Sequence, residues 1–425
     1  MTTKILPTSV LSLINADRMA NNFIEMAKID TVSDESKAET DQVPSTESQR
    51  ILAGKLGEEL KAIGLEGVQV NKNAVVTGVL PSNIPVRESI PTIGLFAHVD
   101  LADDSPTNNI QPVVHKNYQG GDLILGHGTV ISAVDLSGHT GEDIITSDGK
   151  TLLGADDKAG IAEILEVCRV YIEHPEIERP HIKIAFTPDE EIGRGMDFFD
   201  IQAFGANAAY TVDGSVPGEI ESETFNAHQV TITFEGKDVH PGYAKDIMIN
   251  SIRAMSDFIT LLPKNEAPET TSGRQGYIHP LSVPKVSVSE SVLTLIVRDF
   301  NFDSSQERIS RIKELASEVE KLYPGLSVKI KVREQYRNMR EYIERKPEVV
   351  EFARKGIEDT GLVIIDKPIR GGTDGSSLSL KGLPTPNLAA GGRNFHSVRE
   401  FVTIQDMRKC AAVVINTLSH WAKSK

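Results

Sequence analysis

The side chains best suited to chemistry in this sequence are acids and histidines, most of which follow short apolar runs. They form five clusters, which are His98-Val99-Asp100, Asp156-Asp157, Glu190-Glu191, Asp213 and Asn394-Phe395-His396. Carboxylates gathered in one place repel each other unless cations hold them ionised. Two histidines with several carboxylates suit Zn²⁺, Mn²⁺ or Co²⁺, whereas Ca²⁺ and Mg²⁺ prefer sites built from oxygen alone. Together the five clusters predict a pair of divalent metal ions, with zinc as the first choice.

Two of these clusters have spacings that suggest distinct roles. In an extended chain His98 and Asp100 lie on one face, so Asp100 can accept the second ring N–H of a metal-bound His98. Of the neighbours Glu190 and Glu191, one can bind a metal while the other takes a proton from bound water. Each acid taken alone is also explained as a helix N-cap or a solvated loop residue. It is the combination that favours hydrolysis at a metal centre.

Composition limits the class of protein and its partners. A chain of 425 residues exceeds what one hydrophobic core usually supports, which predicts two domains. Hydrophobic content of 39%, charged content of 25% and no apolar stretch of about 18 residues indicate a soluble globular protein. The net charge of −15 argues against nucleic acids and anionic membranes as partners. We therefore expect a small molecule as the main partner.

Two further features bear on the compartment. The only cysteines, Cys168 and Cys410, lie in helix-like apolar patterns, which is typical of small buried residues in a reducing environment. The first 15 residues contain Pro7 and scattered polar residues, and no small-residue cleavage site follows them. We expect no signal peptide and a cytoplasmic location.

Strands alternate with helices over the first half of the chain, which predicts an α/β sheet. The expected strands are residues 68–70, 75–80, 93–98, 152–153, 182–187 and 208–212. A helix is expected from Thr46, with Gln49 completing a capping box, to a C-cap at Gly64, and another over 159–170. If these strands are parallel, the clusters at their carboxyl ends lie at one edge of the sheet.

The pattern changes near Ala227 to strand, helix, two strands, helix and strand. The expected bounds are 229–234, 243–262, 283–289, 292–299, 304–323 and 326–332. This βαββαβ order is the ferredoxin-like split unit. The first pattern resumes near Glu341 and ends in a helix over 404–421, whose buried stripe is Met407, Cys410, Ala411, Val414, Leu418 and Trp421. We expect an α/β domain over 1–224 and 337–425 with a smaller domain over 225–336 inserted into it.

Several segments resemble, in order from about Met19 to the end, the tripeptide aminopeptidases of the peptidase T family. They are H-V-D, L-L-G-A-D-D-K-A-G, A-F-T-P-D-E-E-I-G, Y-T-V-D-G, V-H-P-G, I-V-R-D-F, N-M-R-E, P-I-R-G-G-T-D-G and F-H. This family belongs to the superfamily of co-catalytic di-zinc exopeptidases. The short H-V-D and D-E-E segments resemble the superfamily as a whole, whereas the longer segments resemble peptidase T in particular. The resemblance implies a mixed-sheet zinc exopeptidase domain with helices on both faces, plus an inserted ferredoxin-like lid domain.

The resemblance also implies roles for single residues. It makes Asp156 the carboxylate that bridges two zinc ions, with Asp157 in a supporting position. The remaining ligands are then His98 and Asp213 for one ion, and Glu191 and His396 for the other. Glu190 becomes the general base and Asp100 the residue that orients His98. His240 is expected to help hold the oxyanion, and the candidates for substrate binding are Arg298, Asn338, Arg340 and Arg370.

Some of these roles have simpler alternatives. His240 precedes a proline and can be only a turn residue, and Arg298 can be an ordinary strand charge. The segment 371–375 lacks the lysine of the nucleotide-binding pattern, so a tight turn beside the substrate is preferred to a nucleotide site. Leu101 to Asp104, Arg393 and Ser397 also depart from the family's residues, which leaves substrate preference open.

We expect a di-zinc aminopeptidase that releases the N-terminal residue from short peptides, with tripeptides as its substrates. A dipeptidase or an N-acyl-amino-acid deacylase of the same superfamily is the nearest alternative. A metal-dependent binding protein without activity and a two-metal phosphohydrolase are less favoured, the former because Glu190 is present. A homodimer formed through unpaired strand edges of the lid domain is also expected.

Overall fold

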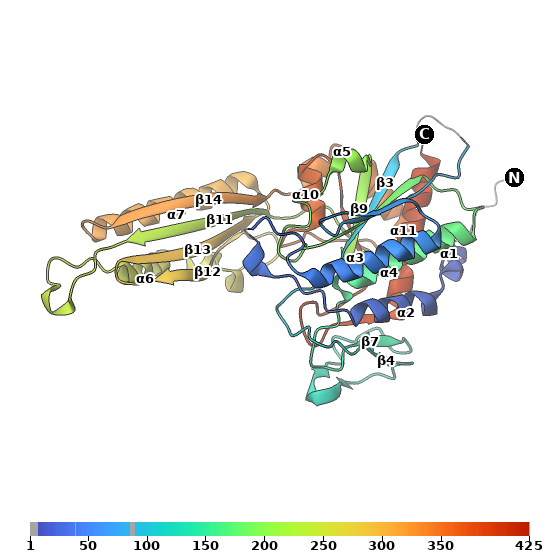
Figure 1. The fold of residues 1–425 in the computed structure, drawn as a ribbon, viewed down its shortest axis with the longest axis horizontal. Coiled ribbons are helices and arrows are strands. Elements are labelled where there is room, and N and C mark those ends of the chain that lie inside the picture. The colour runs from blue at the N-terminus through green and yellow to red at the C-terminus, as the bar shows by residue number, and fades with distance from the viewer. Residues whose placement is uncertain (1–6, 39, 86–89, 425) are drawn as a thin grey trace. The chain divides into compact units, whose positions relative to one another are not determined.

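The computed structural model describes residues 7–38, 40–85 and 90–424 (Figure 1). The chain forms two compact units. Unit 1 comprises residues 1–222, 341–367 and 373–425, and unit 2 comprises residues 223–340 and 368–372. The first six residues of the stretch considered for a signal peptide lie outside the described residues. None of the described helices combines the length and the apolar character needed to cross a bilayer.

Unit 1 is built on a mixed sheet, as predicted. Within the described residues eight strands form it, in the spatial order β1 (Glu66–Val70), β2 (Val76–Leu80), β8 (His181–Thr187), β3 (Thr92–His98), β9 (Ala208–Gly214), β16 (Asn387–Ala389), β10 (Glu219–Glu221) and β15 (Ile365–Asp366). Strand β3 runs parallel to both β8 and β9, whereas β2 is antiparallel to β8. The carboxyl ends of β3, β8 and β9 therefore meet at one edge.

Helices cover both faces of this sheet. The α-helices of unit 1 are α1 (Pro7–Leu13), α2 (Ala16–Ala27), α3 (Glu47–Ile63), α4 (Ala155–Glu173), α5 (Ile201–Phe204), α9 (Glu348–Asp359), α10 (Asp374–Leu380) and α11 (Ile404–Lys423), and α8 (Arg340–Ile343) begins at the last residue of a unit 2 segment. On one face Phe96 of β3 packs against Phe199 and Phe204, in a cluster that includes Leu378 of α10. Helix α4 packs on β3 and β9 and is itself covered by α2 and α11. Every residue of the predicted stripe on α11 is buried.

Helix α3 has the predicted bounds but not the predicted cap. Gly64 ends it with φ 101°, a left-handed conformation that glycine adopts without strain. The expected capping box is wrong, because Thr46 Oγ1 donates to the carbonyl of Val32. The side-chain amide of Gln49 instead donates to the carboxylate of Asp189 at 2.7 Å. Gln49, whose spacing from Thr46 predicts a helix cap, therefore joins two segments that are distant in the sequence.

Residues 102–151 form a region that the sequence pattern did not predict. Within the described residues, β4 (Val113–His115), β7 (Ile144–Thr146) and β17 (Phe401–Thr403) pair in a small sheet, and β5 (Leu123–Ile124) and β6 (Val130–Ile131) form a hairpin. The expected strand at 152–153 is wrong, since both residues are irregular and buried in the approach to α4. Pairing of β17 with β7 fixes the chain just after His396.

Unit 2 has the predicted ferredoxin-like topology. Its elements are β11 (Asn226–Glu235), α6 (Ser251–Leu261), β12 (Tyr277–Val286), β13 (Glu290–Asp299), α7 (Phe302–Leu322) and β14 (Ser327–Tyr336). The sheet order, over the part of the chain that is described, is β12-β13-β11-β14, with antiparallel neighbours. Alternate residues of β11, including Val230 and Ile232, are buried with Phe258 of α6 and Ile312 of α7.

The largest errors in the predicted bounds of unit 2 concern α6 and β12. The helix expected over 243–262 begins only at Ser251, because Asn250 caps it by accepting from the N–H groups of Ile252 and Arg253. The strand expected over 283–289 begins earlier, at Tyr277, and ends at Val286, since a tight turn from Ser287 to Glu290 leads into β13. In both cases the apolar pattern continues through a segment that turns.

Candidate metal centre

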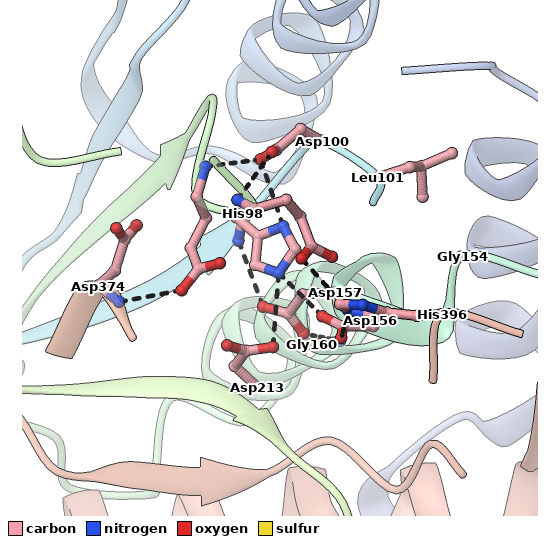
Figure 2. A network of polar contacts seen from close by, with 12 residues as sticks. His98, Asp100, Leu101, Gly154, Asp156, Asp157, Gly160, Asp213, Asp374 and His396 are labelled. Carbon is pink, nitrogen blue, oxygen red and sulfur yellow. Dashed lines mark hydrogen bonds and ion pairs between the residues drawn. The ribbon is translucent and has the colours of Figure 1, made fainter. Parts of the chain in front are cut away.

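Five elements of unit 1 bring the predicted acids and histidines together at the carboxyl edge of the sheet (Figure 2). His98 is the last residue of β3, and Asp213 lies near the end of β9. Glu190 and Glu191 follow β8, Asp156 lies in the first turn of α4, and His396 lies in the loop before β17. The strand ends supply part of the cluster, whereas a helix start and a loop supply the rest.

Asp156 lies between the two histidines. Its Oδ1 is 2.9 Å from Nε2 of His98, and its Oδ2 is 3.3 Å from Nε2 of His396. Asp213 Oδ1 is 3.5 Å from the same His98 nitrogen, and Glu191 Oε2 is 3.2 Å from the same His396 nitrogen. Each oxygen of Asp156 therefore faces a separate set of one histidine and one further carboxylate. This is the arrangement expected of a carboxylate shared by two metal ions.

Close packing of α4 sets the position of Asp156. A Cβ atom on Gly160 would lie 1.9 Å from the carbonyl oxygen of Val212, so glycine allows α4 to approach β9 directly. The peptide bond between Asp156 and Asp157 is cis. Asp157 is buried, and its two oxygens accept hydrogen bonds from the backbone N–H groups of His98 and Gly160, each at 3.2 Å. Asp157 thus supports the backbone around the cluster.

Glu400, which sequence analysis missed, holds the start of α4. This side chain is buried and accepts from the N–H groups of Leu153 at 2.7 Å, Gly154 at 2.8 Å and Asp156 at 3.1 Å. Burial raises its pKa to about 7. The available sequence signal is an acid directly before the apolar run that becomes β17, but its partners lie about 245 positions away.

Asp189, also missed, anchors the turn that carries the two glutamates. It is fully buried and accepts from Ser45 N at 2.7 Å, Ser45 Oγ at 2.5 Å and Gln49 Nε2 at 2.7 Å. Its own N–H donates to Gln49 Oε1 at 3.1 Å. The start of α3 therefore fixes Glu190 and Glu191, which explains why Gln49 does not cap its helix.

The cluster carries more acid than its surroundings can keep ionised. Burial, followed by repulsion from Asp156, raises the pKa of Asp213 well above its usual range. Burial does the same for the pKa of Glu190. Hydrogen bonds to Asp156 and Glu191 raise the pKa of His396 to about 11. Two divalent cations would relieve this repulsion and hold the carboxylates charged.

The side chains present fit such ions. The donor set of two imidazoles and several carboxylates suits Zn²⁺, Mn²⁺ or Co²⁺. Within the described part of the chain, Oε1 of Glu191 is among the buried side-chain atoms that have no hydrogen-bond partner. Buried polar atoms are normally paired, and a metal ion is one partner that satisfies a carboxylate oxygen. Three-residue groups that could hold an ion include His98 with Asp156 and Glu191, and His98 with Asp157 and Asp213.

Glu190 lies beside these groups and belongs to none of them. Its Oε1 accepts a hydrogen bond from the backbone N–H of Asp374 at 3.2 Å (Figure 2). Asp374 is in turn fixed by Thr187, whose Oγ1 donates to its carboxylate at 2.9 Å. The geometry therefore keeps a carboxylate that belongs to neither ligand group next to the candidate ligands, where a general base has to lie.

The other five predicted site residues lie in unit 2. His240 is exposed, and its Nδ1 accepts from the N–H of Gly242 at 3.1 Å, which caps the short helix Pro241–Tyr243. That turn role was the simpler alternative, and it leaves Nε2 to carry the ring proton. Arg298 is buried, donates to the carbonyl of His228 at 3.3 Å and lies over the ring of Tyr336.

The remaining three make contacts within unit 2. Asn338 is buried, with its amide donating to the carbonyl of Phe300 at 3.0 Å. Arg340 lies 3.7 Å from the carboxylate of Glu223. Arg370 donates to the carbonyls of Gly273 and Gln275 at 2.7 and 2.8 Å and stacks on Phe225 and Tyr277. Asn338 and Arg370 therefore hold backbone segments of unit 2 in place, which is a structural role independent of any substrate contact.

The unexpected Arg393 has a clear structural role. Its Nη1 donates to the carbonyls of Ser215 at 2.8 Å and Gly391 at 2.7 Å, and its Nη2 donates to Asp406 at 3.1 Å. The loop before His396 is thus tied to the end of β9 and to α11. Ser397, another of the departures, accepts from the N–H of Arg399 at 3.0 Å.

One further group of possible ligands, His139, Glu142 and Asp406, lies away from this centre. Lys409 approaches Glu142 at 3.2 Å and Asp406 at 2.8 Å, while Arg393 also pairs with Asp406. Two cations already neutralise these carboxylates, so this group is an ion-pair network.

Comparisons with known proteins agree with the sequence resemblance. The model of Peptidase family M20/M25/M40 matches residues 146–420. Peptidase T of Bacillus pumilus is 44% identical over 404 residues, covering 94% of this chain and 97% of the relative. Peptidase T of Clostridium perfringens strain SM101 is 43% identical over 409 residues, covering 96% and 99%. The predicted resemblance to peptidase T is confirmed.

Solved structures share the fold. Aminopeptidase PepT from Bacillus cereus superposes with a TM-score of 0.74 at 22% identity, covering 97% of this chain and all of the other. A dinuclear metal binding peptidase of the M20 family from Bacillus subtilis gives a TM-score of 0.65 at 14% identity, covering 95% and 98%. The predicted fold class is therefore confirmed.

Proposed function

The chain belongs to peptidase family M20/M25/M40 and is a peptide hydrolase, and we propose that it is a di-zinc aminopeptidase releasing the N-terminal residue from tripeptides. The observation that carries the proposal is the position of Asp156, whose two oxygens face His98 and His396 at 2.9 and 3.3 Å. The substrate follows from the peptidase T relatives, which match nearly the whole chain.

The proposed ligands divide into two sets that share Asp156. His98 and Asp213 complete one site, and Glu191 and His396 complete the other, in line with their distances in the cluster. Zinc is the proposed metal, with Mn²⁺ or Co²⁺ as substitutes. When bound, the ions would lower the pKa of a water molecule and polarise the scissile carbonyl.

Glu190 is the proposed general base. Its carboxylate takes one proton from the attacking water, whose oxygen bonds to the peptide carbonyl carbon. The same carboxylate then gives that proton to the amide nitrogen, so that the C–N bond breaks and the amine leaves. The N–H of Asp374 donates to one oxygen of Glu190 and so orients the carboxylate. Asp100 orients His98, and the Nε2–H of His240 stabilises the oxyanion.

The remaining proposals concern the domains, the substrate contacts, the oligomeric state and the cellular location. We propose residues 1–224 and 337–425 as the catalytic domain and 225–336 as the lid domain. Substrate carboxylate or backbone contacts are assigned to Arg298, Asn338, Arg340 and Arg370. The edge strands β12 and β14 support a homodimer through the lid. The buried free thiols of Cys168 and Cys410 support a cytoplasmic location.

The test compares wild type, Glu190→Gln and, as a matched control, Glu358→Gln, which changes an exposed acid on α9. Each protein is stripped of metal, reloaded with zinc and assayed for zinc content. Release of the N-terminal residue is then measured from an amino acid amide, a dipeptide, a tripeptide, a tetrapeptide and an N-acetylated tripeptide. We expect two zinc ions per chain and turnover of the free tripeptide, reduced about 10²–10⁴-fold in Glu190→Gln alone.

Other outcomes would move the assignment. Cleavage of the acetylated peptide would indicate a deacylase, and preference for the dipeptide would indicate a dipeptidase. Two bound zinc ions without turnover would indicate a binding protein. Full activity of Glu190→Gln would remove this residue as the base.

A further inference from the structure

We propose that Asp104 is a positioning residue for His396, fixing the imidazole so that its Nε2 faces Asp156 and Glu191. The inference rests on the proposed function, because it takes His396 as a metal ligand. The contact that carries it joins Oδ2 of Asp104 and Nδ1 of His396, which lie 2.9 Å apart.

The two ring nitrogens of His396 have different partners. Nε2 lies 3.3 Å from Asp156 and 3.2 Å from Glu191, whereas Nδ1 faces Asp104. When Nε2 binds a metal, Nδ1 must carry the ring proton, and a carboxylate is its strongest acceptor. Donation of that proton to Asp104 selects one tautomer and makes Nε2 a better electron donor.

His396 depends on such a partner more than His98 does. The side chain of His98 is 2% exposed and is held by the packing around β3, whereas that of His396 is 38% exposed. His396 also lies in a loop with a left-handed backbone, at φ 60°. A loop histidine that is not enclosed by neighbours needs hydrogen bonds to keep its ring in one orientation.

The segment around Asp104 forms two hydrogen bonds with His396, one with the ring and one with the backbone. Ser105, the next residue, donates its Oγ to the backbone carbonyl of His396 at 2.8 Å. Leu101 and Ala102, just before Asp104, are buried and anchor the segment as it leaves β3. The chain that follows His98 therefore holds both the ring and the backbone of His396, which links the two proposed ligand sets.

The neighbouring Asp103 provides a matched control. The side chain of Asp104 is 62% exposed, so its replacement should leave the fold intact. Asp103 is also exposed, and in the described part of the chain its side chain forms neither a hydrogen bond nor an ion pair. Asp103→Ala removes the same charge from nearly the same place without removing the contact.

The experiment measures zinc affinity, with activity as a secondary readout. Full-length wild type, Asp104→Ala, Asp104→Asn, Asp103→Ala and His396→Ala are stripped of metal and checked for folding by circular dichroism. Competition with a chromophoric chelator then gives two zinc dissociation constants per chain. Histidine ring ¹⁵N NMR of the zinc-loaded proteins reports the tautomer of His396.

We expect Asp104→Ala to weaken one of the two constants about 10- to 100-fold. It should be the constant that is lost in His396→Ala, while Asp103→Ala changes neither constant. Asp104→Asn should be intermediate, since its amide oxygen can still accept the proton. The Nδ1–H signal of His396 should be retained in Asp103→Ala and lost to solvent exchange in Asp104→Ala.

The inference is overturned if wild type binds two zinc ions and Asp104→Ala behaves like Asp103→Ala. Equal weakening of both constants would also overturn it, because that result indicates a general effect of charge. Binding of fewer than two zinc ions by wild type is a different failure, since it removes the proposed function and this inference together.

Discussion

Asp100 holds the turn that carries Glu190, because its Oδ1 accepts the backbone N–H of Glu190 at 3.0 Å. Its Oδ2 accepts the N–H of Glu191 at 3.1 Å. The predicted contact with His98 is longer, with 3.4 Å between Oδ1 and Nδ1. Asp100 is fully buried and therefore fixes the end of β8 to the end of β3 as well as facing the His98 ring.

Asp100→Asn should impair both stability and activity. The amide group turns one acceptor into a donor that faces a backbone N–H, which leaves a buried polar group unpaired. We expect a loss of about 1–3 kcal/mol in the free energy of unfolding, measured by urea denaturation of the metal-free protein. Peptidase activity should fall at least about tenfold. Glu190→Gln is the comparison, since it should lose activity without any loss of stability; equal stability of the two variants would contradict this role.

Glu400→Gln should weaken both zinc sites. The Glu400 carboxylate accepts from three backbone N–H groups next to Asp156, and the amide can accept from only part of them. Because Asp156 is the proposed bridge, we expect both dissociation constants to rise about tenfold or more. The chelator competition described for Asp104 measures them. A change in only one constant would show that Glu400 does not act through the shared carboxylate.

Zinc should stabilise the folded chain. The proposed ligands come from distant segments, so the site exists only in the folded state. At free zinc 100 times above the dissociation constant, a single site adds about 2.7 kcal/mol to the free energy of unfolding. Differential scanning calorimetry should show a higher melting temperature with zinc, and no shift in a His98→Ala, His396→Ala double variant. A zinc shift that survives in that variant would locate the metal elsewhere.

Glu221→Gln should remove a pH dependence of stability. Burial raises the pKa of Glu221 from its ordinary 4.5 to about 7, although Asn387 donates to its carboxylate at 2.7 Å. Between these values the folded state holds a proton that the unfolded chain releases, so this contribution to stability is complete below about pH 4.5 and lost as pH rises through 7.

We therefore expect the difference in the free energy of unfolding, Glu221→Gln minus wild type, to increase by an amount on the order of 2–3 kcal/mol from pH 5 to pH 8. Urea denaturation at several pH values measures the difference. Glu358→Gln, at an exposed position, is the control and should give a constant difference. A constant difference for Glu221→Gln as well would show that this carboxyl is ionised in the folded state.

The sequence pattern predicted most elements because their signals are local. Alternating or continuous apolar runs gave β3, β8, β9 and the strands of unit 2, and the stripe on α11 was correct residue by residue. Two of the failures have a common cause, which is a contact with a distant segment. Gln49 was assigned to its own helix although it bonds to Asp189, 140 positions away. The apolar run at 152–153 predicts a strand, although it is irregular, buried chain in which the N–H of Leu153 donates to Glu400.

By itself the sequence determined which side chains are available for chemistry, the family, and the two kinds of topology. These depend on residue types at short spacings, which local backbone preferences and motifs express. Only the tertiary structure decided that each oxygen of Asp156 faces a different histidine. It also decided that Asp104, Asp189 and Glu400 support the centre. Those partners are brought together by packing of α4 on the sheet and by loop closure, and hydrogen bonds between segments more than 100 positions apart have no local sequence pattern.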